Sequence, residues 1–320
     1  MLTYILKRCV LAAFTLLVLV TIIFILVRLL PGDPFVSEKT NEAIRQQMIR
    51  YHGFDRPIHE QWVKYVGTLI KGDLGISLKY QGRSVNSAIA ATFPFSGALG
   101  VRALVFALVV GLFLGVIAAQ KAGHTLDYVC ILIAIIGVSA PEFVVSTLLQ
   151  LGFSIKLKWL PATQWLSWRH MILPVFALSL NTLAQLARLT RSSMMEVISQ
   201  DYILTARAKG LSQLQIIWRH QIRNSILPIL TLMGPRVAAL LAGTFVVEQI
   251  FAIPGMGRFF VQSINDLDYT MVLGMTVFYG LFLVIANLIV DILYGIVDPR
   301  IKLAEKKYKA SDFEEAEKEA

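Results

Sequence analysis

The chain has 320 residues, of which 56% are hydrophobic and 16% are charged, and its formal net charge is +9. The apolar residues are gathered into runs of about 20, the length that a helix needs to cross a hydrocarbon core of roughly 30 Å. Such runs exclude an ordinary soluble globular protein. Lys and Arg collect beside these runs, as membrane topology requires, so the excess charge does not indicate a nucleic-acid partner. The sequence therefore predicts an all-α polytopic membrane protein embedded in lipid.

The apolar runs predict six transmembrane helices, of which the fourth is the shortest. They cover residues 9–30, 99–119, 129–153, 171–187, 226–247 and 271–296. The first run resembles a signal peptide, but it is longer than the roughly 7–15 apolar residues of such a segment. We therefore expect an uncleaved first span.

Charge predicts the orientation of these spans. With the N-terminus in the cytoplasm, the inside segments hold fifteen Lys and Arg residues and the short outside loops hold four. The long 31–98 loop is left out, because long loops cross the membrane largely regardless of charge. Both termini are predicted to be cytoplasmic. The predicted divisions are an N-terminal span 1–30, an extracytoplasmic helical segment 31–98, a five-helix core 99–298 containing a cytoplasmic loop 188–225, and a cytoplasmic tail 299–320.

Small residues at every fourth position mark two of the spans. Such stripes let two helices approach closely, and packing inside one bundle is favoured over a contact between subunits. The stripes are Ala107, Gly111, Gly115 and Ala119 in the second span, and Gly234, Ala238 and Ala242 in the fifth.

A few polar side chains lie within the predicted spans, where they are costly and often functional. Arg236, in "MGPRVAALLAG", is either part of a translocation pathway that meets a carboxylate of the cargo or half of a structural ion pair. Glu142, in "VSAPEFVVS", faces the pathway or lies near a bend at Pro141. Asn181 and Gln185 are four residues apart, so a hydrogen bond between helices is favoured over contact with cargo.

Several kinds of chemistry are missing from the sequence. There is no GxxxxGK[ST] phosphate loop and no HExxH, and every histidine lies outside the predicted spans. We therefore expect no ATP bound through such a loop, no metal site, no cofactor in this chain and no enzymatic activity of its own.

The polar stretch "DYILTARAKGLSQLQIIWRHQIRNS", residues 201–225, joins the fourth and fifth spans. Its pattern predicts two short helices that meet at Gly210. One interpretation is an amphipathic pair lying on the lipid headgroups, which periodicity alone favours. The other is a compact projection that fits a groove on a soluble partner.

Several motifs occur together and in a fixed order along residues 1–303. They are "RLLPGDP", "KGDLGIS", "SAPEF", "TARAKG" followed by "RHQIRNSILP", "EQIFAIPGMG" and "DPRIK". The set resembles the permease subunits of ATP-binding-cassette importers, in the dipeptide and oligopeptide branch, and most of all the B-type membrane subunit of an oligopeptide permease. The resemblance implies a permease that moves oligopeptides inward across the cytoplasmic membrane of a prokaryote.

The resemblance also implies partners. These are a homologous second permease subunit, two ATPase subunits that use ATP and Mg, and an extracytoplasmic peptide-binding protein. The 201–225 stretch would hold the cytoplasmic coupling helix, which is seated on an ATPase. The implied coupling residues are Tyr202, Thr205, Ala206, Arg207, Ala208, Lys209, Gly210 and Leu211. Leu204 stands where the general importer pattern has glutamate, and Arg223 where many importers have proline.

Other functions remain open at this point. One alternative is an importer of the same type that carries nickel or glutathione, although spans without histidine argue against nickel. A peptide-sensing scaffold that no longer transports would tolerate a damaged coupling loop, whereas this loop keeps Ala206 and Gly210. A stand-alone channel or secondary carrier would need no ATPase contact, so co-purification with ATPases separates it from an importer.

Overall fold

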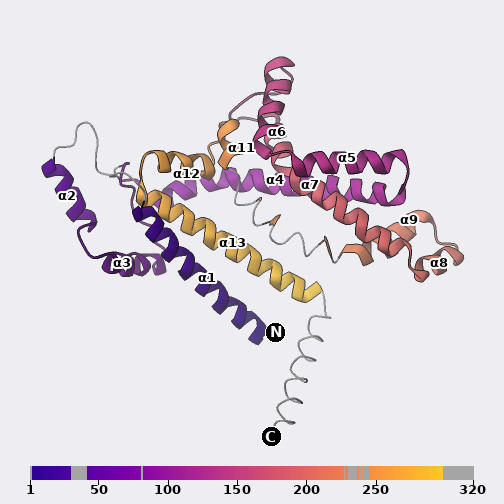
Figure 1. The fold of residues 1–320 in the computed structure, drawn as a ribbon, viewed down its shortest axis with the longest axis horizontal. Coiled ribbons are helices and arrows are strands. Elements are labelled where there is room, and N and C mark those ends of the chain that lie inside the picture. The colour runs from indigo at the N-terminus through magenta and orange to yellow at the C-terminus, as the bar shows by residue number, and fades with distance from the viewer. Residues whose placement is uncertain are drawn as a thin grey trace, which may run out of the picture.

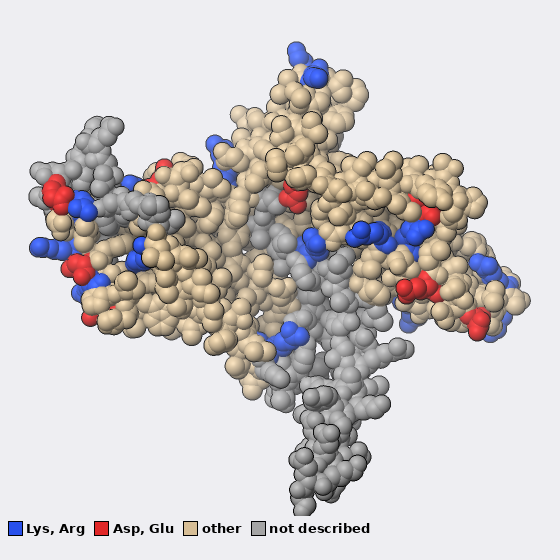
Figure 2. Space-filling model, viewed as in Figure 1, with Lys and Arg blue, Asp and Glu red and all other residues tan. Residues whose placement is uncertain are grey.

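A computed structural model describes residues 2–29, 42–80, 82–226, 228–229, 236–237, 240 and 245–297. Their regular secondary structure is helical, apart from one isolated antiparallel bridge between Ile76 and Ser84. Long helices run across the molecule, and short helices lie at their ends (Figure 1). Figure 2 shows Lys and Arg at the tips of the molecule and also in a row from the centre to the right of the visible face.

Four long helices confirm the first, second, fourth and sixth predicted spans as apolar helices long enough to cross a membrane. They are α1 (Leu2–Leu29), α4 (Val85–Gln120), α7 (Trp168–Ile198) and α13 (Tyr269–Val297). Helix α7, which corresponds to the fourth predicted span, is 31 residues long and extends well beyond the predicted range 171–187. Its ends were missed because they are polar, although they continue the same helix.

The third predicted span, 129–153, is not one straight helix. It is divided into α5 (Thr125–Ser139) and α6 (Glu142–Leu149), and α6 continues as the π-helical segment Gln150–Lys156. The two parts are bent by 107°. Pro141 lies at the bend and explains it, because proline donates no backbone hydrogen bond and disfavours helical geometry in the residue before it. Figure 1 shows α6 rising away from the layer of α4, α5 and α7.

Most of the fifth predicted span, 226–247, lies outside the described residues. The same holds for the small residues of its stripe, Gly234, Ala238 and Ala242, and for the tail 299–320.

The glycines of the second span pack against α7. A Cβ atom added to Gly111 would lie 2.9 Å from the carbonyl oxygen of Leu183, and one added to Gly115 would lie 2.5 Å from Cβ of Thr190. Ala107 and Ala119, in the same stripe, are buried. The stripe therefore serves packing within the chain, as its spacing predicted.

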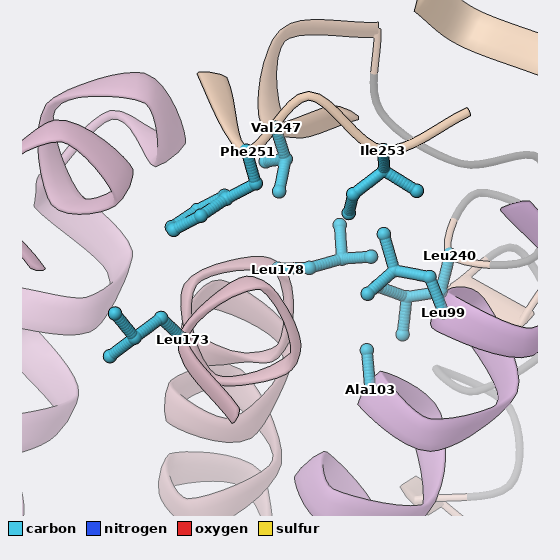
Figure 3. Close-up of a cluster of buried hydrophobic side chains, with 8 residues drawn as sticks. All are labelled: Leu99, Ala103, Leu173, Leu178, Leu240, Val247, Phe251 and Ile253. Carbon is cyan, nitrogen blue, oxygen red and sulfur yellow. The ribbon is translucent and has the colours of Figure 1, made fainter. Parts of the chain in front are cut away.

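A core cluster joins α4 and α7 to α11 (Phe245–Ile250) and the turn that follows it. Figure 3 shows these side chains converging from helices far apart in the sequence. The cluster consists of Leu99, Ala103, Leu173, Leu178, Leu240, Val247, Phe251 and Ile253.

The 42–84 segment contains α2 (Glu42–His52), α3 (Ile58–Ile70) and a loop that leads into α4. The apolar face of α3 packs against α1 and α13 through Trp62, Tyr65, Val66 and Leu69. The sequence assigned no role to Arg28, at the end of α1. Its Nη2 donates a 2.7 Å hydrogen bond to Oε1 of Gln61 on α3, and its guanidinium lies 4.3 Å from the ring centre of Phe24. Arg28 therefore fastens α3 to α1.

The "KGDLGIS" loop is attached to the corner before α13. The buried carboxylate of Asp268 accepts hydrogen bonds from the Ser77 hydroxyl and from the backbone N–H of Leu78, the latter at 3.1 Å. The Tyr80 hydroxyl donates to Asp266 at 2.7 Å, and this bond raises the pKa of Tyr80. The loop is therefore held by carboxylates from a distant part of the chain, a role that the motif alone did not indicate.

Candidate functional sites

The polar residues that were singled out within the spans converge in space. Nη2 of Arg236 donates to Oε1 of Gln185 at 2.7 Å, and Nη1 donates to Oδ1 of Asn181 at 3.5 Å. Nε2 of Gln185 also donates to Oδ1 of Asn181 at 2.6 Å. Asn181 reaches α5 by donating to the carbonyl oxygen of Val138 at 3.3 Å. The favoured interpretation of Asn181 and Gln185 as partners in hydrogen bonds between helices agrees with this geometry.

Glu142 lies within electrostatic reach of the same cluster. It is the first residue of α6, immediately after the bend, and the positive charge of Arg236 acts on its carboxyl group. Both side chains are partly exposed. A guanidinium whose partners are mostly neutral amides keeps much of its attraction for an anion. The cluster of Arg236, Asn181, Gln185 and Glu142 is therefore able to hold a carboxylate or to fasten three helical segments together.

The predicted pair of helices in the 201–225 stretch is present. The first helix is α8 (Asp201–Ala208). The second is α9 (Gln213–Ile216), which continues directly as the π-helical segment Ile217–Ile222. We call residues 201–222 the α8–η2 projection. Figure 1 shows it at one extremity of the molecule, beyond the end of α7. Gly210 forms the corner with a φ of +74°, a value that glycine adopts without strain.

The coupling residues implied by the resemblance fall into two groups. Ala206 is only 4% exposed and packs with Ile203 and Ile216 inside the projection, with Leu211 partly covering them. Its small size therefore serves close packing between α8 and α9. The other implied residues are exposed on the surface of the projection: Tyr202, Thr205, Arg207, Ala208, Lys209 and Gly210.

Trp218 and Leu214 are also exposed on the projection, 65% and 68% respectively. The projection thus presents an apolar and basic surface, which suits either lipid headgroups or an acidic groove on a protein.

A third polar site lies in the "EQIFAIPGMG" motif. Glu248 on α11 is fully buried, and its Oε2 accepts a hydrogen bond of 2.7 Å from the N–H of Gly257 and one of 3.2 Å from the N–H of Arg258. These donors lie in the first turn of α12 (Met256–Asn265), where a negative charge is favoured. A Cβ on Gly255 would lie 2.3 Å from Oε2 of Glu248, so the motif requires glycine there. The motif was visible in the sequence, but the role of Glu248 in holding the first turn of α12 was not.

Replacing Glu248 with Ala is expected to destabilise the protein by about 2–4 kcal/mol, because the buried N–H of Gly257 and the partly buried N–H of Arg258 lose their acceptor and a cavity is left. Replacing it with Gln keeps an acceptor oxygen and is expected to cost much less. Thermal unfolding of the detergent-purified variants measures the difference. Equal melting temperatures for the two variants would contradict this account of the motif.

Two family models match most of the chain. The model described as "Binding-protein-dependent transport system inner membrane component" matches residues 111–303, and its N-terminal companion matches residues 1–94. The chain belongs to this family. It is accordingly a multi-pass membrane permease subunit of the ATP-binding-cassette importer type, in which ATP hydrolysis is the task of partner ATPases.

Curated members of the family resemble this permease over nearly its whole length. The dipeptide transport system permease protein of Bacillus subtilis is 47% identical over 304 residues, covering 95% of this chain and 99% of its own. The oligopeptide transport system permease proteins of Salmonella typhimurium and Escherichia coli are 42% and 43% identical over 306 residues, covering 94% of this chain and all of their own. The resemblance to the dipeptide and oligopeptide branch is therefore confirmed.

A solved structure of the inward-facing MetNI methionine transporter covers 67% of this permease and 96% of its own chain, with a TM-score of 0.47 and 16% identity. Within the described residues, no group of three or more His, Cys, Asp and Glu side chains is placed to hold a metal ion.

Proposed function

We propose that this permease moves oligopeptides inward across the cytoplasmic membrane of a prokaryote, driven by partner ATPases. The observation that carries the proposal is the identity of 42–47% to permeases named for dipeptides and oligopeptides, over 94–95% of the chain. Identity of that extent covers the spans, the polar cluster and the projection together.

The α8–η2 projection is proposed to lie in the cytoplasm and to be seated on an ATPase. Three features support this. It is compact, with a buried core of its own around Ile203 and Ala206. Its exposed surface carries Arg207 and Lys209, which suit an acidic groove. The Lys and Arg count favours the cytoplasmic side for this loop.

The remaining partners follow from the same assignment. A homologous second permease would complete the translocation path, and two ATPases would bind ATP and Mg. An extracytoplasmic peptide-binding protein would deliver the cargo. The 42–84 segment is proposed as its docking surface, supported by the rigid attachment of that segment through Asp268, Tyr80 and Arg28.

A nucleotide-dependent crosslink tests the seating of the projection. Ala208 is exposed, so Ala208→Cys places a thiol on the proposed contact surface. The exposed Cys9 is first replaced with Ser, whereas the buried Cys130 is retained. We expect a crosslink to a co-expressed ATPase whose yield changes with ATP. A thiol that reacts freely from water in every nucleotide state would refute the coupling role and favour helices lying on lipid headgroups.

The cargo is tested separately with the assembled complex in proteoliposomes. We expect ATP-dependent accumulation of a labelled oligopeptide when its binding protein is present. Accumulation of Ni²⁺ or glutathione in place of the peptide would assign the other cargo, and complete loss of ATP dependence would indicate a channel or secondary carrier.

Replacing Arg236 with Met tests whether the polar cluster meets the cargo. Met keeps the length of the side chain but removes its charge, so uptake of a peptide with a free C-terminal carboxylate is expected to fall roughly 5-fold to 10-fold. Uptake of the same peptide with an amidated C-terminus is expected to change little, and Arg236→Lys is expected to retain most activity. Equal effects on both peptides would make Arg236 a structural residue.

A further inference from the structure

Three glutamine side chains connect the α8–η2 projection to the end of α4. Nε2 of Gln213 on α9 donates to Oε1 of Gln120 at 2.9 Å. Nε2 of Gln120 in turn donates to Oε1 of Gln221 at 2.6 Å. Gln120 is the last residue of α4, and Gln221 lies in the π-helical segment of the projection. We call this chain of amides the glutamine bridge.

Gln221 makes the bridge unusual. Its side chain is completely buried, and its Nε2 has no hydrogen-bond partner among the described residues. Burying an unpaired amide donor costs free energy that an apolar side chain would avoid. The bond to Gln120 is the one interaction described for this side chain, so an amide at this position serves to hold the projection on α4.

Nearer its N-terminus, α4 contacts the start of α12. The buried hydroxyl of Ser96 accepts a 2.8 Å hydrogen bond from the N–H of Met256, the first residue of α12. Ser96 and Gln120 lie about 36 Å apart along the helix axis, at roughly 1.5 Å per residue. No proline interrupts α4 between them, because its one proline is Pro94. Figure 1 shows α4 extending from beside α12 towards α9.

α4 is also packed rigidly along this length. Gly111 and Gly115 are in close contact with α7, which leaves little room for the two helices to slide independently. Near the projection, Asp127 and Arg191 form a two-point ion pair between α5 and α7, at 2.6 and 2.8 Å. A displacement applied at Gln120 is therefore passed along α4 and not absorbed at its end.

We propose that Gln120 is a positioning residue that couples the α8–η2 projection to α4 and, through Ser96, to α12. The inference rests on the proposed function, because the displacement comes from ATPases seated on the projection. By linkage, a displacement of α12 is passed back towards the projection through the same contacts. Neutral amides suit this place, since they fix the position of two elements without adding charge beside the membrane.

The test compares Gln120→Met with Gln120→Glu in the complete complex of both permeases, ATPases and binding protein. Met fills the same space but makes no hydrogen bonds. Glu accepts from Gln213, and also from Gln221 once that amide rotates to present its unpaired Nε2. The readout is peptide uptake per ATP hydrolysed in proteoliposomes. Gln120→Met is expected to lower this ratio roughly 5-fold to 10-fold, and Gln120→Glu is expected to stay within about twofold of the wild type.

A second variant covers the case in which Gln120→Met does not assemble. Gln213 is exposed, so Gln213→Met leaves no cavity. It is expected to lower peptide uptake per ATP hydrolysed by a smaller factor than Gln120→Met does. The matched control is Gln200→Met, because Gln200 is also exposed and the hydrogen bond that the structure describes for its side chain goes to the carbonyl oxygen of Glu196 in its own turn. The control is expected to keep the wild-type ratio.

Two outcomes would overturn the proposal. One is a wild-type ratio in Gln213→Met and in any assembled Gln120→Met. The other is an equal loss in Gln120→Met and Gln120→Glu, which would mean that the shape of the side chain and not its hydrogen bonds matters. Failure of the proposed function is distinguishable, because the wild-type complex would then show no ATP-driven peptide uptake before any variant is compared.

Discussion

Replacing Gly210 with Asp is expected to reduce ATP-driven peptide uptake by at least about tenfold, while the amount of inserted permease stays the same. Gly210 is exposed at the corner of the projection, and no atom of the described residues lies within 4 Å of a Cβ built there. The new side chain therefore meets no steric clash, and its cost to the fold is backbone strain at a positive φ. It adds a carboxylate to the surface that is proposed to face an acidic groove of the ATPase, where juxtaposed like charges cost several kcal/mol.

The control for backbone strain is Gly210→Asn. The φ of +74° at this corner is unfavourable for most side chains, but Asn and Asp tolerate it about equally well. The two variants therefore share size and strain and differ in charge. We expect Gly210→Asn to reduce uptake by less than about threefold. Normal uptake in Gly210→Asp would remove the projection from the coupling mechanism, and an equal loss in both variants would assign the effect to shape.

Replacing Gly115 with Leu is expected to lower the free energy of unfolding by at least about 3 kcal/mol, the largest effect on stability that we expect. A Cβ at Gly115 would already lie 2.5 Å from Cβ of Thr190 and 2.7 Å from the carbonyl oxygen of Ala187. Neither atom is the end of a flexible side chain, so α4 and α7 would have to separate. We expect little monodisperse protein after extraction in detergent, with a lower unfolding temperature for what remains.

Gly97→Leu is the matched control on the same helix. A Cβ at Gly97 meets only the Phe93 ring, at 3.8 Å, which is an ordinary contact. The control is expected to change the free energy of unfolding by no more than about 1 kcal/mol. Similar yields and melting temperatures for the two Leu variants would show that the α4–α7 contact does not set the stability of the permease.

Most of the spans were predictable from local properties. The apolar character of α1, α4 and α13 is visible in single runs of residues, although α4 begins at Val85, well before the predicted start at residue 99. The small-residue stripe around Gly111 and Gly115 predicted a close helix contact, and its partner proved to be α7. The bend between α5 and α6 was harder, because Pro141 permits a straight continuation with a lost hydrogen bond as well as a sharp turn.

The candidate sites were predictable as residues but not as arrangements. Arg236, Asn181 and Gln185 were each visible as costly polar groups in apolar surroundings. The hydrogen bonds that Arg236 donates to the other two, however, join residues 51–55 positions apart in the sequence. Ala206 was read as a contact position, whereas it is buried inside the projection. Periodicity did not decide this, because α8 has only eight residues and both of its faces carry apolar side chains.

The sequence by itself determined the class of the protein, the positions of most spans and, through ordered motifs, the family. These properties depend on the length and composition of contiguous segments, which the hydrocarbon thickness and the cost of buried charge constrain directly. Only the tertiary structure decided that Glu248 holds the first turn of α12, that Asp268 holds the "KGDLGIS" loop, and that Gln120 connects α4 to the projection. Each of these depends on a hydrogen bond whose partner is brought close by the packing of other elements, and no local pattern of residues specifies that partner.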